Sequence, residues 1–259
     1  MHDESVCIVS AVRDFDLYGR LIAHNPNTIA AQLITLDNRK DNLPIPRRYN
    51  DFLEDYDYSK PAWFVFCHED FEILEPLAPL LEKLPRQHLY GPFGCKRIGL
   101  FGIGMQITRG HLQECNRDGS GTPWICGSDK GMTMSKVETF DCCCLIVHSS
   151  LVQKHHLRFD ENLLFDLYVE DFCATAKIQH GIQSRILRFS AMHHSGSHPT
   201  ERLYRHLPYL EKKYPRNCFC GTCTYFGTMP KLMRLQRALT NILQFFRTVH
   251  PPKALPSPV

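Results

Sequence analysis

The stretch Trp63–Leu74, WFVFCHEDFEIL, is an apolar run that ends in three ionisable residues, His68, Glu69 and Asp70, before the apolar pattern resumes. The run Ala62–Cys67 has the length and composition of a buried strand. In open α/β sheets, ligands bind beyond the carboxyl ends of the strands. The polar triplet is therefore a candidate site at the end of this strand.

Short apolar runs alternate with amphipathic stretches along the chain, the pattern expected of an α/β sheet. The predicted strands are 6–12, 32–36, 62–67, 137–148 and 183–191, and the predicted helices are 17–24, 75–84 and a run that opens at Glu170–Asp171. The segment 90–136 is rich in glycine and predicts an irregular lid or substrate loop.

Composition limits the class of protein. The 259 residues, 43% of them hydrophobic, suit one large domain with or without an appendage. No apolar run reaches 18 residues, so we expect no membrane-spanning helix. The first ten residues have no basic stretch followed by an apolar one, so we expect no signal peptide. Most of the 12 cysteines lie in apolar runs, where a reduced cysteine behaves as a small hydrophobic residue. Reduced cysteines are typical of a reducing compartment, so we expect a cytoplasmic protein.

The positive charge is concentrated at the C-terminus. The net charge is +3, yet no acidic residue follows Glu211, while eight lysines and arginines do. Apolar residues at 232, 235, 239, 242, 246 and 249 form one face of a predicted helix. Two interpretations stay open: this helix packs on its own domain, or it lies on an anionic membrane surface. Aromatic and basic residues do not interleave as in proteins that stack single-stranded bases, so we expect no nucleic-acid partner.

Polar residues also follow the other predicted strands. Each alone can be a structural cap or a satisfied histidine, but their shared placement predicts one cleft. A carboxylate at the start of a helix is in addition favoured by the helix dipole. These groups are Asp14, Asp37 with Asn38, His193 with His194 and Ser195, and Glu170 with Asp171.

Carboxylates after a buried strand can hold Mg²⁺ or Mn²⁺, and the cation in turn binds a diphosphate. A histidine from a later strand end completes the set if the ion is Mn²⁺. A second carboxylate, farther from the metal, can serve as general base on an acceptor hydroxyl.

Taken in order, six stretches resemble the nucleotide-sugar glycosyltransferases of family 2, in particular bacterial polysaccharide-type members. They are CIVSAVRDF (7–15), LITLDN (33–38) followed by RRYNDFL (47–53), WFVFCHEDFEIL (63–74), VETFDCCCLIV (137–147), FDENLLFDLYVEDFCATAKIQHG (159–181) and MHHSGSH (192–198). The resemblance implies an A-type glycosyltransferase fold, a mixed, mainly parallel sheet flanked by helices. It also implies a divalent metal, a nucleoside-diphosphate sugar donor and a glycan or lipid-linked acceptor.

The resemblance assigns roles residue by residue. Asp171, with Glu170 beside it, looks like the catalytic base of a single displacement with inversion. Asp70 matches the last aspartate of the family's Asp-x-Asp metal motif, and His68 stands where that motif has its first aspartate. His193 or His194 is similar to a late histidine near the diphosphate, which gives the metal set Asp70, His68, His193 and His194.

The same resemblance implies a nucleotide-sugar site made of Ser10, Val12, Asp14, Asp37, Asn38, Asn50, His68 and Glu69. Cys142–Cys144 depart from the family, where glycine or small apolar residues follow the position of Asp141. We expect a catalytic domain over 1–205 and a cysteine-containing basic extension over 206–259. A lipid-linked acceptor would suit a peripheral position on the inner face of a membrane.

The extension contains the sequence CFCGTC, with Cys218, Cys220 and Cys223. The Cys-x-x-Cys spacing suits structural Zn²⁺, with Cys115, Cys126 or His206 as a fourth ligand, although reduced, unligated cysteines are the simpler interpretation. Two alternative functions follow. One is a zinc-stapled, non-enzymatic binding module, and the other is a metal-dependent phosphohydrolase, which uses a metal-activated water in place of the acceptor hydroxyl.

Overall fold

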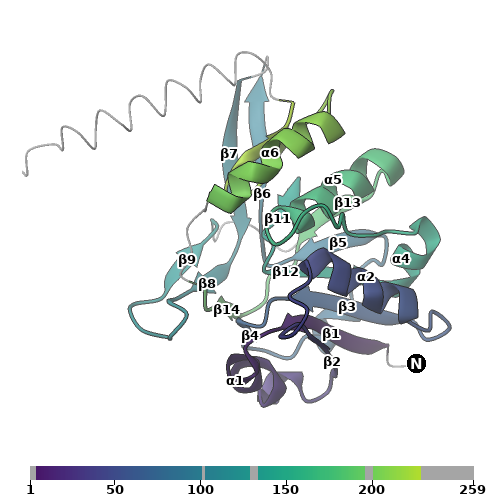
Figure 1. Cartoon of the computed structure of the whole chain (residues 1–259), viewed down its shortest axis with the longest axis vertical. Helices are drawn as coiled ribbons and strands as arrows, with labels where there is room; N and C mark the ends of the chain where they lie inside the picture. The colour runs from purple at the N-terminus through teal and green to yellow at the C-terminus, as the bar shows by residue number, and fades with distance from the viewer. Residues whose placement is uncertain (1–3, 101–102, 129–133, 196–200, 229–259) are drawn as a thin grey trace, which may run out of the picture.

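A computed structural model describes residues 4–100, 103–128, 134–195 and 201–228 (Figure 1). The helices are α1 (Phe15–Tyr18), continued by a π-helical turn (Gly19–Ala23), a 3₁₀ turn (Pro26–Thr28), α2 (Ile45–Asp55), α3 (Ala78–Leu81), α4 (Ser149–His155), α5 (Tyr168–His180) and α6 (Glu201–Lys213). The strands are β1 (Ser5–Val12), β2 (Gln32–Asp37), β3 (Ala62–Cys67), β4 (Phe71–Ile73), β5 (His88–Gly91), β6 (Phe93–Leu100), β7 (Ile103–Gly110), β8 (Leu112–Glu114), β9 (Trp124–Cys126), β10 (Lys136–Val137), β11 (Thr139–Phe140), β12 (Cys144–His148), β13 (Gln183–Ile186), β14 (Ala191–His193), β15 (Cys218–Cys220) and β16 (Tyr225–Gly227).

The main sheet has seven strands in the order β10-β13-β5-β12-β3-β1-β2. β1 pairs in parallel with β2 and β3, and β13 pairs in parallel with β5. β12 is antiparallel to both of its neighbours, β3 and β5, and β10 is antiparallel to β13. The fold is thus α/β with a mixed sheet flanked by helices, as predicted. Five of the seven strands run in one direction, and only β10 and β12 run opposite to them, so the sheet is mainly parallel in strand direction.

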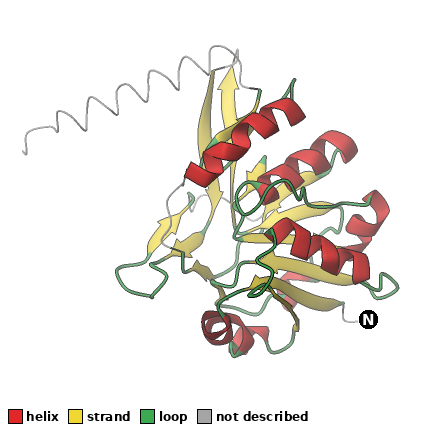
Figure 2. Ribbon diagram, viewed as in Figure 1, coloured by secondary structure: helices red, strands yellow, loops and turns green. Residues whose placement is uncertain are grey.

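Both faces of the central strands are buried. Successive side chains of β1 and β3 point to opposite faces of the sheet, and each face has its own hydrophobic core. Phe64 and Phe66 pack with α2, α4 and α5 on one face. Trp63 and Val65 pack with α1, its π-helical turn and α3 on the other. Figures 1 and 2 show the helices gathered on these two sides of the strands. The stacked helices fix the carboxyl ends of β1, β2 and β3 along one edge.

A second sheet, β4-β14-β8-β9, continues from that edge. β4 begins directly after the His68–Asp70 triplet and pairs with β14, so that Phe71 lies opposite His193. β14 pairs on its other side with β8, where His193 lies opposite Glu114. This register brings three segments that are far apart in the sequence into one row beside Asp70.

Several predicted elements have different bounds. The segment 90–136 is not an irregular loop in its described part: it forms β5 to β9, including the long β6–β7 hairpin that extends beyond the main sheet (Figure 1). The predicted strand 137–148 is two strands, β11 and β12, in different sheets with a turn at Asp141–Cys143 between them. The predicted strand 183–191 also divides, into β13 and β14, and the helix expected over 75–84 is only the single turn α3.

The C-terminal part of the described chain is hydrogen-bonded to strands of the preceding part. The boundary predicted at 205/206 falls inside α6. The backbone carbonyl of Cys220 accepts hydrogen bonds from Thr139 and Cys95, and the amide of Gln106 donates to the carbonyls of Gly221 and Thr222. The amphipathic helix predicted over 232–249 lies outside the described residues. Among the residues that are described, no helix combines the length and hydropathy needed to cross a membrane.

Candidate metal and nucleotide site

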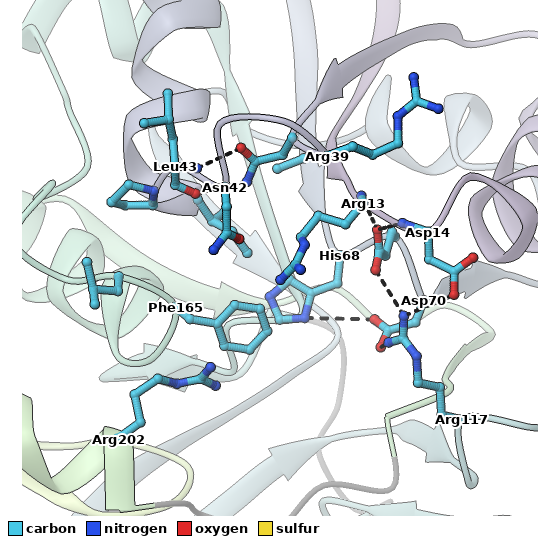
Figure 3. Close-up of a pocket in the computed structure, with 16 residues that line it drawn as sticks. Arg13, Asp14, Arg39, Asn42, Leu43, His68, Asp70, Arg117, Phe165 and Arg202 are labelled. Carbon is cyan, nitrogen blue, oxygen red and sulfur yellow. Dashed lines mark hydrogen bonds and ion pairs between the residues drawn. The ribbon is translucent and has the colours of Figure 1, made fainter.

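A pocket of about 710 Å³ opens at the carboxyl ends of β1, β2 and β3 (Figure 3). Four of its side chains are arginines, and they surround a smaller acidic group at the end of β3. The lining residues are Ala11, Arg13, Asp14, Asn38, Arg39, Asn42, Leu43, Pro44, Ile45, His68, Glu69, Asp70, Arg117, Leu164, Phe165 and Arg202. The position is the one expected of a ligand site in an α/β sheet.

His68, Asp70 and His193 meet at the inner wall of this pocket. Their ligand atoms lie within 4.8 Å of one another, and all three residues are buried. Asp70 Oδ1 is 3.9 Å from His68 Nδ1 and 3.3 Å from His193 Nε2. Two imidazoles and one carboxylate are a common ligand set for a divalent transition metal.

The hydrogen bonds around His68 determine which of its two ring nitrogens carries the proton. Tyr168 Oη donates its one proton to the carbonyl of Cys142 at 2.9 Å, so it accepts from His68 Nε2, also at 2.9 Å. The lone pair of a neutral His68 is then on Nδ1, the atom that faces Asp70. Burial lowers the pKa of His68 and so favours this neutral form.

Two buried atoms of the group, Asp70 Oδ1 and His193 Nε2, face each other at 3.3 Å and have no other hydrogen-bond partner within the described structure. A cation between them could take the place of this ion pair, because each atom would then offer it a lone pair. His193 Nδ1 lies 3.3 Å from Glu114 Oε1, the position of an outer carboxylate that orients a ligating histidine. The residues present therefore fit a divalent metal.

Neighbouring side chains also set the charges of His193 and Asp70. Burial alone would lower the pKa of His193, but the carboxylates of Asp70 and Glu114 raise it to about 10. Burial would raise the pKa of Asp70, yet His193, His68 and Arg117 lower it to about 2. A charged imidazole thus stands beside a charged carboxylate, and a metal held by His193 would have to displace the proton from its ring.

Arg117 lies on the solvent side of the same carboxylates. Its guanidinium donates to Asp70 Oδ2 and to Glu69 Oε1, both at 3.0 Å, and Asp14 Oδ2 is 3.5 Å away. The other oxygen of Glu69 accepts from the backbone amides of Arg13 and Asp14. Glu69 therefore fixes the chain after β1, while Arg117 balances the negative charge of the triplet.

The outer part of the pocket is cationic and partly aromatic. Figure 3 shows Arg13, Arg39, Arg117 and Arg202 placed around it. The guanidinium of Arg202 lies over the ring of Phe165, 4.3 Å from its centroid, and this ring is in turn 5.2 Å from the imidazole of His68. A site with a metal-ligand set and several guanidinium groups suits a diphosphate carried on a divalent cation.

A second polar cluster adjoins the turn between β11 and β12. The thiol of Cys142 donates to Glu170 Oε2 at 2.9 Å, and Thr222 Oγ1 donates to Asp141 Oδ2 at 2.8 Å. Burial, followed by the charge of Asp141, raises the pKa of Glu170 to about 8. A carboxyl group with a pKa near neutrality is suited to proton transfer.

Asp171, the predicted base, has a different environment from the one expected. Its carboxylate accepts from Tyr214 Oη at 2.7 Å and from Lys213 Nζ at 2.8 Å, and the side chain is buried. Lys213 also binds Asp160. The geometry makes Asp171 an anchor between α5 and the end of α6, and within the predicted pair it is Glu170 that lies beside Asp141 and Cys142.

The structure distinguishes the two adjacent histidines. His193 faces Asp70, whereas His194 Nε2 pairs with Glu72 at 2.8 Å and its Nδ1 lies 3.2 Å from the thiol of Cys115. Neighbouring residues of a strand point to opposite faces, which separates the two rings. His194 is therefore not part of the group around Asp70.

The predicted nucleotide-binding residues divide in the same way. Asp14, Asn38, His68 and Glu69 line the pocket, while Asp37 reaches it only through its ion pair with Arg39. Three others are used in the fold: Ser10 faces the Cys67 thiol, Val12 is in the core, and Asn50 exchanges hydrogen bonds with the backbone of Phe159.

The cysteines of the CFCGTC sequence do not assemble a zinc site within the described residues. Two groups of ligand atoms converge there, and neither contains Cys218, Cys220 or Cys223. Cys218 and Cys220 are buried on β15, and the candidate fourth ligand Cys115 is occupied with His194 and Met192. The prediction of a zinc staple is not supported by this geometry.

Some residues of the site carry no sequence signal that pointed to them. Arg117 and Glu114 come from the segment interpreted as a lid, and Thr222 comes from the supposed zinc sequence. Arg13 was also missed, although it directly follows a predicted strand, and the rule that identified Asp14 could have identified it. The others depend on strand pairings between distant segments.

Chemically, the pocket can bind a metal-bound anionic ligand, and the adjoining cluster can accept a proton. Neither a scan of protein-family models nor a search of curated proteins gives a match to this chain.

Proposed function

We propose that this protein is a metal-dependent glycosyltransferase with an A-type fold, which takes its sugar from a nucleoside-diphosphate donor. The observation that carries the proposal is the buried group of His68, Asp70 and His193 at the wall of a pocket lined by four arginines. A divalent cation on this group would bind the diphosphate oxygens, and the arginines would neutralise the remaining charge. The mixed set of nitrogen and oxygen ligands favours Mn²⁺ over Mg²⁺.

The nucleoside would occupy the outer pocket at the ends of β1 and β2. Asn38 is fixed there by hydrogen bonds with the backbone of Leu43 in both directions, which shapes the wall of the pocket. Phe165 and Arg202 offer a flat apolar and cationic surface on the opposite side. These features support a planar, anionic ligand of nucleotide size.

In this proposal Glu170 is the general base, in place of Asp171. It would take the proton of an acceptor hydroxyl as that oxygen attacks the anomeric carbon, while the diphosphate leaves from the opposite face, with inversion. Its raised pKa supports the role, since a base with a pKa near the working pH transfers protons efficiently. Asp141, held by Thr222, lies next to it and can orient the acceptor, a glycan or a lipid-linked sugar.

The fold and the sequence resemblance support the proposal jointly. The HED triplet and the Asp141 turn each share a group of ligand atoms with His193 at the end of β14, and Tyr168 at the start of α5 hydrogen bonds to His68, which supports one common site. These are four of the stretches through which the sequence resembles family 2 glycosyltransferases. The non-enzymatic zinc-module alternative loses its main support, because its cysteines do not converge.

The first experiment measures thermal stabilisation by UDP, GDP, CMP and dTDP, each with Mn²⁺, Mg²⁺ or EDTA. A nucleotide present at about 100 times its Kd should stabilise the native state by about 2.7 kcal/mol, or roughly 5–10 °C for a domain of this size. We expect one nucleoside diphosphate to act, and only with metal. Stabilisation by none of them would reject the donor site, and release of phosphate without an acceptor would favour a phosphohydrolase.

A further inference from the structure

The imidazole of His193 belongs to two groups of ligand atoms. One is the group with His68 and Asp70, and the other consists of Asp141, Cys143 and His193, again within 4.8 Å of one another. The second group contains a thiol, which the first lacks. The two groups therefore differ in the metal that they would bind.

The turn that carries Asp141 and Cys143 is held firmly in place. The backbone amide of Cys143 donates to Asp141 Oδ1 at 3.1 Å, and Thr222 holds the other oxygen of that carboxylate. The carbonyl of Cys143 accepts from the amide of His68 at 3.1 Å. The turn is thus tied to the HED triplet, and its ligand atoms are positioned before any cation arrives.

The environment of Cys143 favours a soft cation over a hard one. The residue is 1% exposed, and it supplies the sulfur atom of the group. Sulfur is a poor ligand for Mg²⁺ and Mn²⁺, which prefer oxygen ligands. Zn²⁺ binds thiolate, imidazole and carboxylate together and releases the thiol proton to solvent as it does so.

We propose that Asp141, Cys143 and His193 form a second, thiolate-containing site for Zn²⁺ that excludes metal from the His68–Asp70 group. The exclusion follows from His193, because a neutral imidazole has a single lone pair and serves one cation at a time. Three protein ligands leave a fourth position for water. Zn²⁺ binding itself does not depend on the proposed transferase activity, whereas inhibition of that activity by Zn²⁺ rests on it.

The test uses Co²⁺ as a spectroscopic substitute for Zn²⁺ on the reduced, full-length chain. A bound thiolate gives a charge-transfer band in the near ultraviolet, and we expect this band to saturate at one Co²⁺ per chain and to disappear on adding Zn²⁺. Cys143→Ser should abolish the band. Cys223→Ser, which alters the exposed thiol of the CFCGTC sequence, should keep it. No band in the parent protein, or a band that survives in Cys143→Ser, would overturn the site.

Two further variants test the proposed zinc site independently of Cys143→Ser. Asp141→Asn keeps the thiol and should lower the Co²⁺ affinity by at least about tenfold, so it decides the matter if Cys143→Ser fails to fold. In the parent protein we expect Mn²⁺ to compete with Co²⁺ for His193, and Asp70→Asn should retain the band but lose this competition. A band in Asp70→Asn together with absent nucleotide binding would leave the zinc site standing while rejecting the proposed function. Unchanged Co²⁺ affinity in Asp141→Asn would reject the site.

Discussion

His193 Nε2 lies 3.3 Å from Asp70 Oδ1, and neither buried atom has another hydrogen-bond partner in the described part of the chain. The two residues come from positions 123 apart in the sequence and meet because β14 pairs with β4, directly after Asp70. Glu114 completes the row from β8. A pairing of strands, and not a local motif, creates the candidate metal group.

Asp70→Asn should reduce Mn²⁺ affinity by more than the roughly 10- to 100-fold that loss of an outer-shell partner costs, because it removes the one carboxylate of the group. Glu114→Gln, which alters only the partner of His193 Nδ1, should fall within that range. Calorimetric titration of the purified chain with Mn²⁺ measures both.

The adjacent histidine provides the control. His194→Gln removes an imidazole of equal size whose nitrogens face Glu72 and Cys115, so Mn²⁺ affinity should not change. Equal losses in His194→Gln and His193→Gln would show that the effect is general to β14, and would argue against the proposed ligand set.

Arg117→Met should strengthen Mn²⁺ binding in the absence of nucleotide by a few-fold. The guanidinium now neutralises Asp70 and Glu69 from 3.0 Å and so competes with the metal, although its partial exposure weakens the effect. The same variant should bind a nucleoside diphosphate more weakly, because it lacks one cation of the pocket. Arg205→Met removes an equal charge from α6, where Arg205 pairs with Glu201, and should alter neither affinity. Weaker Mn²⁺ binding in Arg117→Met would contradict the competition.

The central strands could be predicted from the sequence because nearly all of their residues are apolar. Ala62–Cys67 is buried throughout, so it reads as a strand without knowledge of its partners. The β6–β7 hairpin could not, because its glycines resemble those of a loop. A Cβ atom on Gly94 would lie 2.4 Å from the carbonyl of Thr139, so this glycine permits the close approach of β11 to β6.

The site was predictable in its location but not in its details. Strand ends identified the HED triplet, Asp14 and Asn38, which do line the pocket. The choice between His193 and His194 depends on the register in which β14 pairs with β4, and the choice between Glu170 and Asp171 depends on the rotation of α5. Both are set by tertiary packing, and the resemblance to a family could not decide either.

Glu170→Gln and Asp171→Asn form a matched pair of isosteric changes in one helical turn. Under the proposed mechanism, Glu170→Gln should lower the transfer rate by roughly 10²–10⁴-fold while donor binding persists. Asp171→Asn should keep most of the activity but lose stability on the order of 1–3 kcal/mol, because it weakens charged hydrogen bonds from Lys213 and Tyr214. Initial rates and melting temperatures of the two proteins test this. The reverse pattern would restore Asp171 as the base.

The contribution of Glu170 to the stability of the protein should fall as the pH rises from about 4.5 to about 8. Burial and Asp141 raise the pKa of this carboxyl from 4.5 to about 8. Between these values the folded chain holds a proton that the unfolded chain has lost, so each step up in pH favours unfolding. The accumulated loss is on the order of a few kcal/mol, since one unit of pKa corresponds to about 1.4 kcal/mol.

Glu170→Gln tests this assignment without reference to any activity. Its amide cannot ionise, so the part of the pH dependence that belongs to Glu170 should vanish, and the variant should exceed the parent protein in stability near pH 8. Urea unfolding at pH 5, 6.5 and 8 gives the free energies. Parallel slopes for the two proteins would mean that Glu170 is already ionised at low pH, and the argument for it as a base near neutrality would then fail, because its carboxylate would be too weakly basic.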